Sequence, residues 1–162
     1  MKRRRELDPL LCRIDHDRAW IVSAPSRPIP FAAAFRVLLS DRAVVAIEGI
    51  SISDDVKQIL QAHVVEPTLQ IRPGTVFPQT EWLHIRATAE ALSAIDELVN
   101  THADPEICNH LYAYVNGMLL LQWHDAFSDP IHVNGIVSPP LIATFCRALG
   151  VGPAKPPSLS HE

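Results

Sequence analysis

The chain has 162 residues, 48% of them hydrophobic and 20% charged, and this is the composition of a globular domain large enough to bury a core. Its formal net charge of −4 argues against a nucleic-acid partner, because phosphate binding needs clustered Lys and Arg beyond the short run at residues 3–5. No stretch approaches the roughly 18 apolar residues that span a membrane, so we expect no membrane insertion.

The N-terminal half of the chain predicts alternating strands and helices. Residues 10–14 and 19–22 are apolar runs on either side of a polar loop, which is the pattern of a β-hairpin. Apolar residues at helical spacing predict a helix over residues 30–39. The apolar run 43–47 predicts a strand buried on both faces, and Ser53 is the expected N-cap of the next helix.

The middle of the chain is interrupted by prolines. They limit regular structure between residues 64 and 79, and we place a weak seam near residues 72–79. The alternating segment 81–86 predicts a half-exposed strand. Thr88 then begins a helix whose apolar stripe ends near Asn100.

The strongest local signal is Asn-Gly at residues 116–117, between two β-forming runs. A two-residue turn at this position pairs Val115 with Met118 and, one step outward, Tyr114 with Leu119. Continuing the same register predicts one face that carries Tyr112, Tyr114, Leu119, Leu121 and Trp123.

The C-terminal part predicts a third meander strand at residues 131–133 and a last helix. Ser138 is the expected N-cap with Pro139 at the first helical position, and Gly150 ends the helix. The proline-rich tail, residues 152–162, is expected to be disordered.

This order of elements predicts an α+β fold. We expect a mainly antiparallel sheet that includes a C-terminal meander, with helices packed mostly on one face. We also expect a single domain over residues 1–151. Its cysteines, Cys12, Cys108 and Cys146, are odd in number and lie in apolar stretches, which predicts free thiols and a cytoplasmic location, with Cys146 the least reactive.

Recognised motifs for nucleotide binding, for a serine nucleophile and for zinc do not occur in the sequence. The eight histidines are scattered without ligand spacing, so we expect neither a metal site nor a cofactor. A local group of metal-ligand residue types is the alternative: His124, Asp125, Asp129 and His132. Asp129 precedes Pro130, however, and is more simply a turn residue.

Extended to the strand ends, the hairpin register places Cys108, His110 and Asp125 on one face. A carboxylate that orients an imidazole, which in turn lowers the pKa of a thiol, makes an activated nucleophile. These residues are therefore the candidate catalytic site of a thiol-dependent hydrolase or transferase. In the alternative, the strand ends splay apart, His110 stacks on Trp123, and Asp125 caps a turn.

Aromatic side chains form the candidate binding surface. Trp82, Tyr112, Tyr114 and Trp123 are of the types enriched at protein–protein hot spots, although the same side chains would suit a core. Because helices are expected on one side of the sheet only, one apolar face lacks a cover.

We therefore predict a non-enzymatic protein-binding module. Its most concrete form is an inhibitor or immunity-type neutraliser of a basic protein, and a homodimer through the same face is a further form. A third hypothesis, besides the thiol enzyme, is a small-ligand-binding domain with a pocket between the sheet and the helices.

Overall fold

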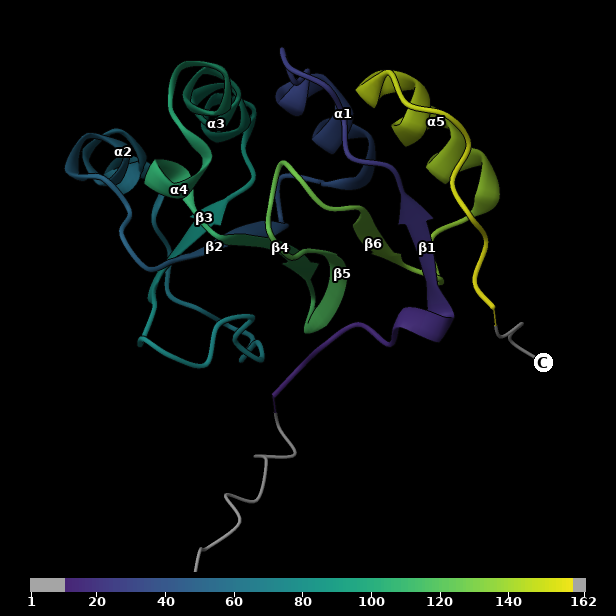
Figure 1. Ribbon diagram of the computed structural model, residues 1–162, viewed down its shortest axis with the longest axis horizontal. Coiled ribbons are helices and arrows are strands. Elements are labelled where there is room, and N and C mark those ends of the chain that lie inside the picture. Colours follow the sequence, from purple (N-terminus) through teal and green to yellow (C-terminus); the bar gives the residue numbers. More distant parts are fainter. Residues whose placement is uncertain (1–10, 159–162) are drawn as a thin grey trace, which may run out of the picture.

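The computed structural model describes residues 11–158, which form an antiparallel sheet with helices packed against one face (Figure 1). The strands are β1 (Ala19–Val22), β2 (Val44–Gly49), β3 (Glu81–Arg86), β4 (His110–Val115), β5 (Met118–Trp123) and β6 (Ile131–Asn134). The helices are α1 (Phe31–Leu38), α2 (Asp54–Leu60), α3 (Ala89–Thr101), α4 (Asp104–Ile107) and α5 (Pro139–Leu149), with short 3₁₀ turns at His16–Arg18 and Gln61–His63.

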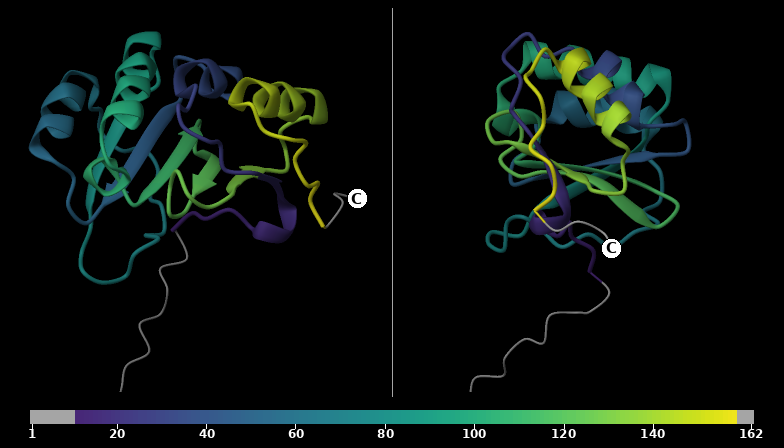
Figure 2. Two further views of the ribbon diagram at one scale, coloured as in Figure 1. Left: turned by 45° about the horizontal axis from the view of Figure 1, so that its top comes forward. Right: turned by 90° about the vertical axis from the view of Figure 1, so that its right-hand side faces the viewer.

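The strands lie in the order β1-β6-β5-β4-β2-β3, and each neighbouring pair is antiparallel. The predicted α+β class is confirmed, together with the C-terminal meander β4-β5-β6. Figure 2 shows α1, α3 and α5 on one side of the sheet, and irregular segments of the chain on the other. Within residues 11–158, no helix is both long enough and apolar enough to cross a membrane.

Local signals in the sequence set the ends of the longer helices. The Thr88 hydroxyl accepts a hydrogen bond from the Ala91 backbone N–H, and α3 begins directly after this cap. Gly150 adopts φ 73°, a left-handed conformation that ends α5 at little steric cost because glycine has no Cβ. The predicted start of α3 and both predicted ends of α5 are confirmed.

The predicted pairing of residues 10–14 with β1 is wrong, because β1 pairs with β6 instead. The Asp15 side chain accepts the backbone N–H of Asp17 and begins a 3₁₀ turn rather than a hairpin turn. The chain before this turn passes beneath the sheet, where Cys12 forms a parallel β-bridge with Ile71.

The predicted register of the β4–β5 hairpin is confirmed next to the turn and wrong beyond it. Tyr114 lies opposite Leu119 as expected, but a bulge between Ala113 and Tyr114 shifts the outer pairs by one residue. Such a shift sends every following side chain of β5 to the other face. Trp123 therefore faces the helices, whereas Tyr112 and Tyr114 face the opposite side.

The segment after α5 is ordered where we predicted disorder. Lys155 exchanges both backbone hydrogen bonds with Ile21 of β1, at 3.0 and 2.9 Å, and lies along the sheet edge. Pro153, Pro156 and Pro157 favour an extended backbone around Lys155. Lys155 itself keeps its backbone N–H and can therefore pair with Ile21, which accounts for the order of this segment. Residues 159–162 of the predicted tail lie outside the described residues.

The sheet has a core on each face. The larger one lies under the helices, where Phe35 stacks near Trp123 and meets Phe145 edge to face. The smaller one, on the opposite face, includes Ile14, Val44, Ile71, Tyr112, Tyr114 and Leu119. Residues 11–18 and 64–80 lie over this second face, and we call the longer segment, residues 64–80, the loop cover.

Candidate functional site

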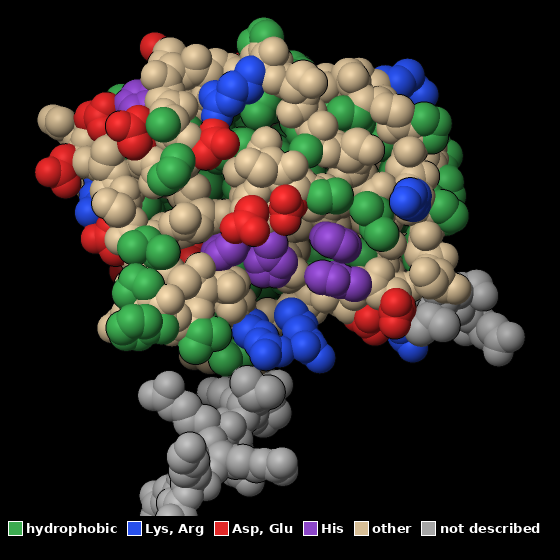
Figure 3. All heavy atoms as spheres, in the orientation of Figure 1, with side chains coloured by type: hydrophobic (Ala, Val, Ile, Leu, Met, Phe, Trp, Pro, Cys, Tyr) green, Lys and Arg blue, Asp and Glu red, His purple; other side chains and the backbone are tan. Residues whose placement is uncertain are grey.

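Polar and aromatic side chains gather on the sheet face beneath the loop cover. They alternate along each strand with apolar side chains that face the helices, because successive residues of a strand point to opposite faces. The polar members are Glu48 on β2, His84 on β3, His110 on β4, Gln122 on β5, His124 just after β5, and His132 on β6. Figure 3 shows histidine side chains reaching the surface together, between acidic and basic groups.

Glu48 is fully buried, and its carboxylate holds the loop cover to the sheet. Oε1 accepts hydrogen bonds from the Tyr112 hydroxyl and the Gly74 backbone N–H, both at 2.8 Å. Oε2 accepts from the Thr80 hydroxyl at 2.9 Å and from the Thr75 backbone N–H at 3.4 Å. Burying a carboxylate is costly unless donors of this kind replace water. One side chain therefore holds the loop cover at Gly74 and Thr75 and again at Thr80.

His110 and His124 form a hydrogen-bonded pair beside this carboxylate. His110 Nδ1 accepts the backbone N–H of Asp125 at 3.1 Å, so its Nε2 is assigned the proton and donates to the Thr75 hydroxyl at 2.8 Å. Nδ1 of His124 lies 3.4 Å from Nδ1 of His110, and the rings meet edge to face. His124 Nδ1 is then the donor of this contact, and His124 Nε2 is an acceptor.

Gln122 connects this pair to a second pair of imidazoles. Its side-chain oxygen accepts the Ile14 backbone N–H at 3.3 Å, which turns its NH₂ group toward His124 Nε2 at 2.6 Å and His16 Nε2 at 3.5 Å. His16 stacks on His132 with ring centroids 4.0 Å apart. We call His110, His124, His16 and His132 the histidine row.

Burial favours the neutral form of two imidazoles in this row. Burial lowers the pKa of His132 to about 4, and the neighbouring His16 and His124 add to the effect. The pKa of His124 is also lowered, first by burial and then by His110 and His16. Within residues 11–158, buried Nδ1 of His132 has no hydrogen-bond partner. Protonating His132 or His124 would thus place a charge at a partly buried imidazole, and at His132 one ring nitrogen would still have no hydrogen-bond partner among the described residues.

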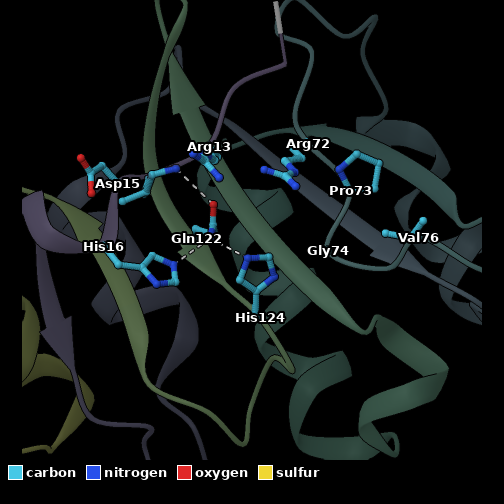
Figure 4. A pocket seen from close by; sticks show the side chains of 10 residues that line it. Arg13, Asp15, His16, Arg72, Pro73, Gly74, Val76, Gln122 and His124 are labelled. Carbon is cyan, nitrogen blue, oxygen red and sulfur yellow. Dashed lines mark hydrogen bonds between the residues drawn. The ribbon is translucent and has the colours of Figure 1, made fainter. Parts of the chain in front are cut away.

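A cavity of about 800 Å³ opens between the histidine row and the loop cover (Figure 4). Gln122 lies at its centre, with His16 and His124 on either side. The loop cover supplies the opposite wall, which includes Val76 and the backbone at Gly74. A Cβ at Gly74 would lie 2.7 Å from His124 Nδ1 and 2.6 Å from His110 Cδ2, so only glycine permits this close approach.

Two arginines from distant parts of the chain share one wall of this cavity. Cys12 bridges Ile71, and the Arg72 backbone N–H donates to the Cys12 carbonyl at 2.8 Å. The parallel bridge brings Arg13 and Arg72, the residues that follow the bridged positions, next to each other. Figure 4 shows both side chains reaching over the cavity near Gln122.

The structure does not give the predicted nucleophile an activated thiol. Cys108 is 1% exposed, and burial, followed by the charge of Glu48, raises the pKa of its thiol. Asp125 contacts His110 through its backbone N–H, not through its carboxylate. His110 is part of the histidine row, where its ring nitrogens bind Thr75, Asp125 and His124 rather than a thiol.

The predicted aromatic binding surface is mostly interior. Tyr112 and Tyr114 are at most 1% exposed beneath the loop cover, and Trp123 is fully buried on the helix side. Trp82 is half-buried and stacks on Tyr112 with ring centroids 5.5 Å apart. The protein-binding hypothesis thus loses the observation on which it rested. An inhibitor or immunity-type function, a basic partner and a homodimer stay predictions.

The alternative metal cluster does not assemble. In the part of the chain that the structure describes, no group of three or more His, Cys, Asp or Glu side chains is placed to hold a metal ion. Of the residues proposed for it, His124 and His132 belong to the histidine row, whereas Asp125 and Asp129 lie in the exposed turn after β5.

Sequence reasoning missed most of this site. Arg13 and Arg72 are brought together by a single bridge between irregular segments, which no periodicity reveals. Glu48 carried a usable signal, since it follows an apolar run that is typical of a buried strand, and a buried acid needs partners.

Searches against models of protein families, against curated proteins and against solved structures gave no match to this chain.

Proposed function

We propose that the protein is a small-ligand-binding domain and that its ligand occupies the cavity between the histidine row and the loop cover. The observation that carries this proposal is a cavity of about 800 Å³ on which several polar side chains converge. Ligand pockets are typically about 300–1,000 Å³, with a few placed polar groups that orient the ligand. The cavity lies on the loop side of the sheet, not between sheet and helices as first expected.

The hydrogen bonds around the cavity favour a preformed site. Glu48 anchors Gly74 and Thr75 from below, and Gln122 ties Ile14 to His124. Walls that are already held in place lose little conformational freedom when a ligand binds, which favours affinity. The buried thiol, by contrast, supplies no reactive group to the cavity, so we propose binding rather than thiol chemistry.

Ligand screening by NMR tests this proposal. A library of small polar compounds is titrated into the protein, and the backbone signals of Gly74 and Val76 and the side-chain amide of Gln122 are followed. We expect at least one compound to shift these signals selectively. The proposal fails if no compound perturbs the cavity, or if every compound that binds perturbs only other surfaces.

Two tryptophan substitutions, one at the cavity mouth and one away from it, test whether the ligand binds in the cavity. Val76 lines the cavity but is 89% exposed, so Val76→Trp should narrow the entrance without disturbing the core. Ile136→Trp makes the same kind of change at a residue that is 62% exposed and does not line the cavity. Binding should weaken in the first variant and persist in the second.

A further inference from the structure

Two arginines, Arg13 and Arg72, are neighbours at the cavity, and no carboxylate of residues 11–158 forms a salt bridge with either of them. Arg13 is exposed and Arg72 is half-buried, and the Cys12–Ile71 bridge sets their backbones next to each other. Within residues 11–158, neither guanidinium forms a salt bridge with a carboxylate. Neighbouring like charges disfavour a fold, so an arrangement of this kind gains most from a bound anion.

The acidic groups near the cavity are already engaged elsewhere. Asp15 lines the cavity, but its carboxylate accepts the Asp17 backbone N–H and lies 3.8 Å from the Arg18 side chain. In Figure 4 this carboxylate points away from Arg13 and Arg72. Glu48 lies beneath the loop, where its four hydrogen-bond donors occupy both oxygens.

The rest of the cavity is suited to the uncharged part of a ligand. The imidazoles of His16 and His124 border it, and Val76 adds an apolar patch at the entrance. The cavity thus has arginine on one wall and imidazole rings and methyl groups on the others. Arginine binds carboxylate and phosphate well because its planar fork matches two oxygens of either group.

We propose that the ligand of this cavity is a small anion whose carboxylate or phosphate group binds between Arg13 and Arg72. This inference rests on the proposed function, since it names the chemical class of the ligand in the same cavity. A nucleic acid is disfavoured as the source of the phosphate, because the chain has a net charge of −4 and, within residues 11–158, Arg13 and Arg72 are the only Lys or Arg side chains that line the cavity.

Thermal unfolding in the presence of defined anions tests the inference. Inorganic phosphate and citrate are the probes for the two headgroups, and glycerol and sodium chloride at matched ionic strength are the neutral and ionic controls. We expect phosphate or citrate, whichever headgroup fits, to raise Tm in a saturable way and by more than glycerol or sodium chloride does. Isothermal titration of that anion then gives its Kd.

Arginine variants show whether the effect comes from this cavity. Arg13→Gln and Arg72→Gln should each weaken binding of the stabilising anion about tenfold or more, since a charge-assisted pair is lost. Arg147→Gln, which removes an exposed arginine of α5, should leave Kd unchanged. Without ligand, the two cavity variants should be at least as stable as the natural chain, because each relieves the repulsion between neighbouring charges.

The outcomes separate this inference from the proposed function. If neither anion raises Tm, or if the arginine variants bind the anion as well as the natural chain, the anion inference is wrong. If a neutral compound from the NMR screen then binds the cavity, the small-ligand proposal still holds. If no compound of either kind binds there, both proposals are wrong.

Discussion

The Tyr112 hydroxyl donates a hydrogen bond to Glu48 Oε1 at 2.8 Å, and neither side chain is exposed to solvent. Tyr112→Phe removes this donor and leaves a buried carboxylate with fewer partners. A hydrogen bond to a charged group contributes about 1.5–3 kcal/mol, so we expect the free energy of unfolding to fall by that amount. Urea unfolding followed by circular dichroism measures the change.

Tyr114 provides the matched control on the same strand face. Its hydroxyl contacts His84 Nδ1 at 2.9 Å and accepts the Thr68 backbone N–H at 3.3 Å. Neither of these partners is the Glu48 carboxylate, so Tyr114→Phe should lower the free energy of unfolding by only about 0.5–1.5 kcal/mol. Equal losses in the two variants would show that Glu48 does not depend on the Tyr112 hydroxyl.

Gly74 is where the loop cover comes closest to the histidine row. Gly74→Ala places a Cβ 2.6 Å from His110 Cδ2, and the loop or the ring must move. Overpacking of this kind costs about 1–3 kcal/mol, and we expect ligand binding in the cavity to weaken as well. Gly152→Ala is the control, because a Cβ there meets nothing within 4 Å, and its stability should match that of the natural chain.

Because of His132, we expect stability to fall on mild acidification. The pKa of His132 is about 4 in the folded protein, below the value of about 6.5 for an unfolded chain. Between these values the unfolded state binds a proton that the folded state does not, so the free energy of unfolding decreases as pH falls from 6.5 to 4. Above pH 6.5 this group adds no pH dependence. Urea titrations across this range measure the slope.

Variants are needed to assign this slope, because other groups titrate in the same range. The pKa of His102 is raised by its hydrogen bond to Asp55, which acts in the opposite direction. His132→Gln should make the slope shallower than in the natural chain, whereas His63→Gln, outside the histidine row, should preserve it. An unchanged slope in His132→Gln would rule out His132 as a source.

The cysteines should react in an order set by burial. Cys12 is half-buried, whereas Cys108 is 1% and Cys146 3% exposed, and burial raises the pKa of both buried thiols. Under native conditions we expect iodoacetamide to label Cys12 first and Cys108 last, as measured by peptide mass spectrometry. This order replaces the sequence-based expectation that Cys146 is the least reactive. Labelling of Cys108 before Cys12 would contradict it.

Elements with a local signal were the predictable part of this fold. Thr88 and Gly150 mark helix ends through their own backbone and side-chain chemistry, and Asn-Gly at residues 116–117 sets the hairpin turn. Each of these features depends on a few neighbouring residues. They were therefore visible without knowledge of the tertiary structure.

The candidate site depends on contacts between distant residues and was not predictable in this way. A single bulge beside Tyr114 moved Trp123 to the opposite face, which removed the expected aromatic surface. The bridge between Cys12 and Ile71 joins segments without regular structure, and it sets the two cavity arginines next to each other. Neither feature leaves a periodic trace in the sequence.

The pairing of Lys155 with Ile21 has a consequence for association between chains. An open edge strand offers unpaired N–H and C=O groups to any other extended chain and promotes aggregation. Lys155 occupies both outward groups of Ile21, and the prolines around it cannot extend the ladder further. The C-terminal segment thus acts as a built-in stop to sheet growth, and loss of it would leave β1 as a template for intermolecular strand pairing.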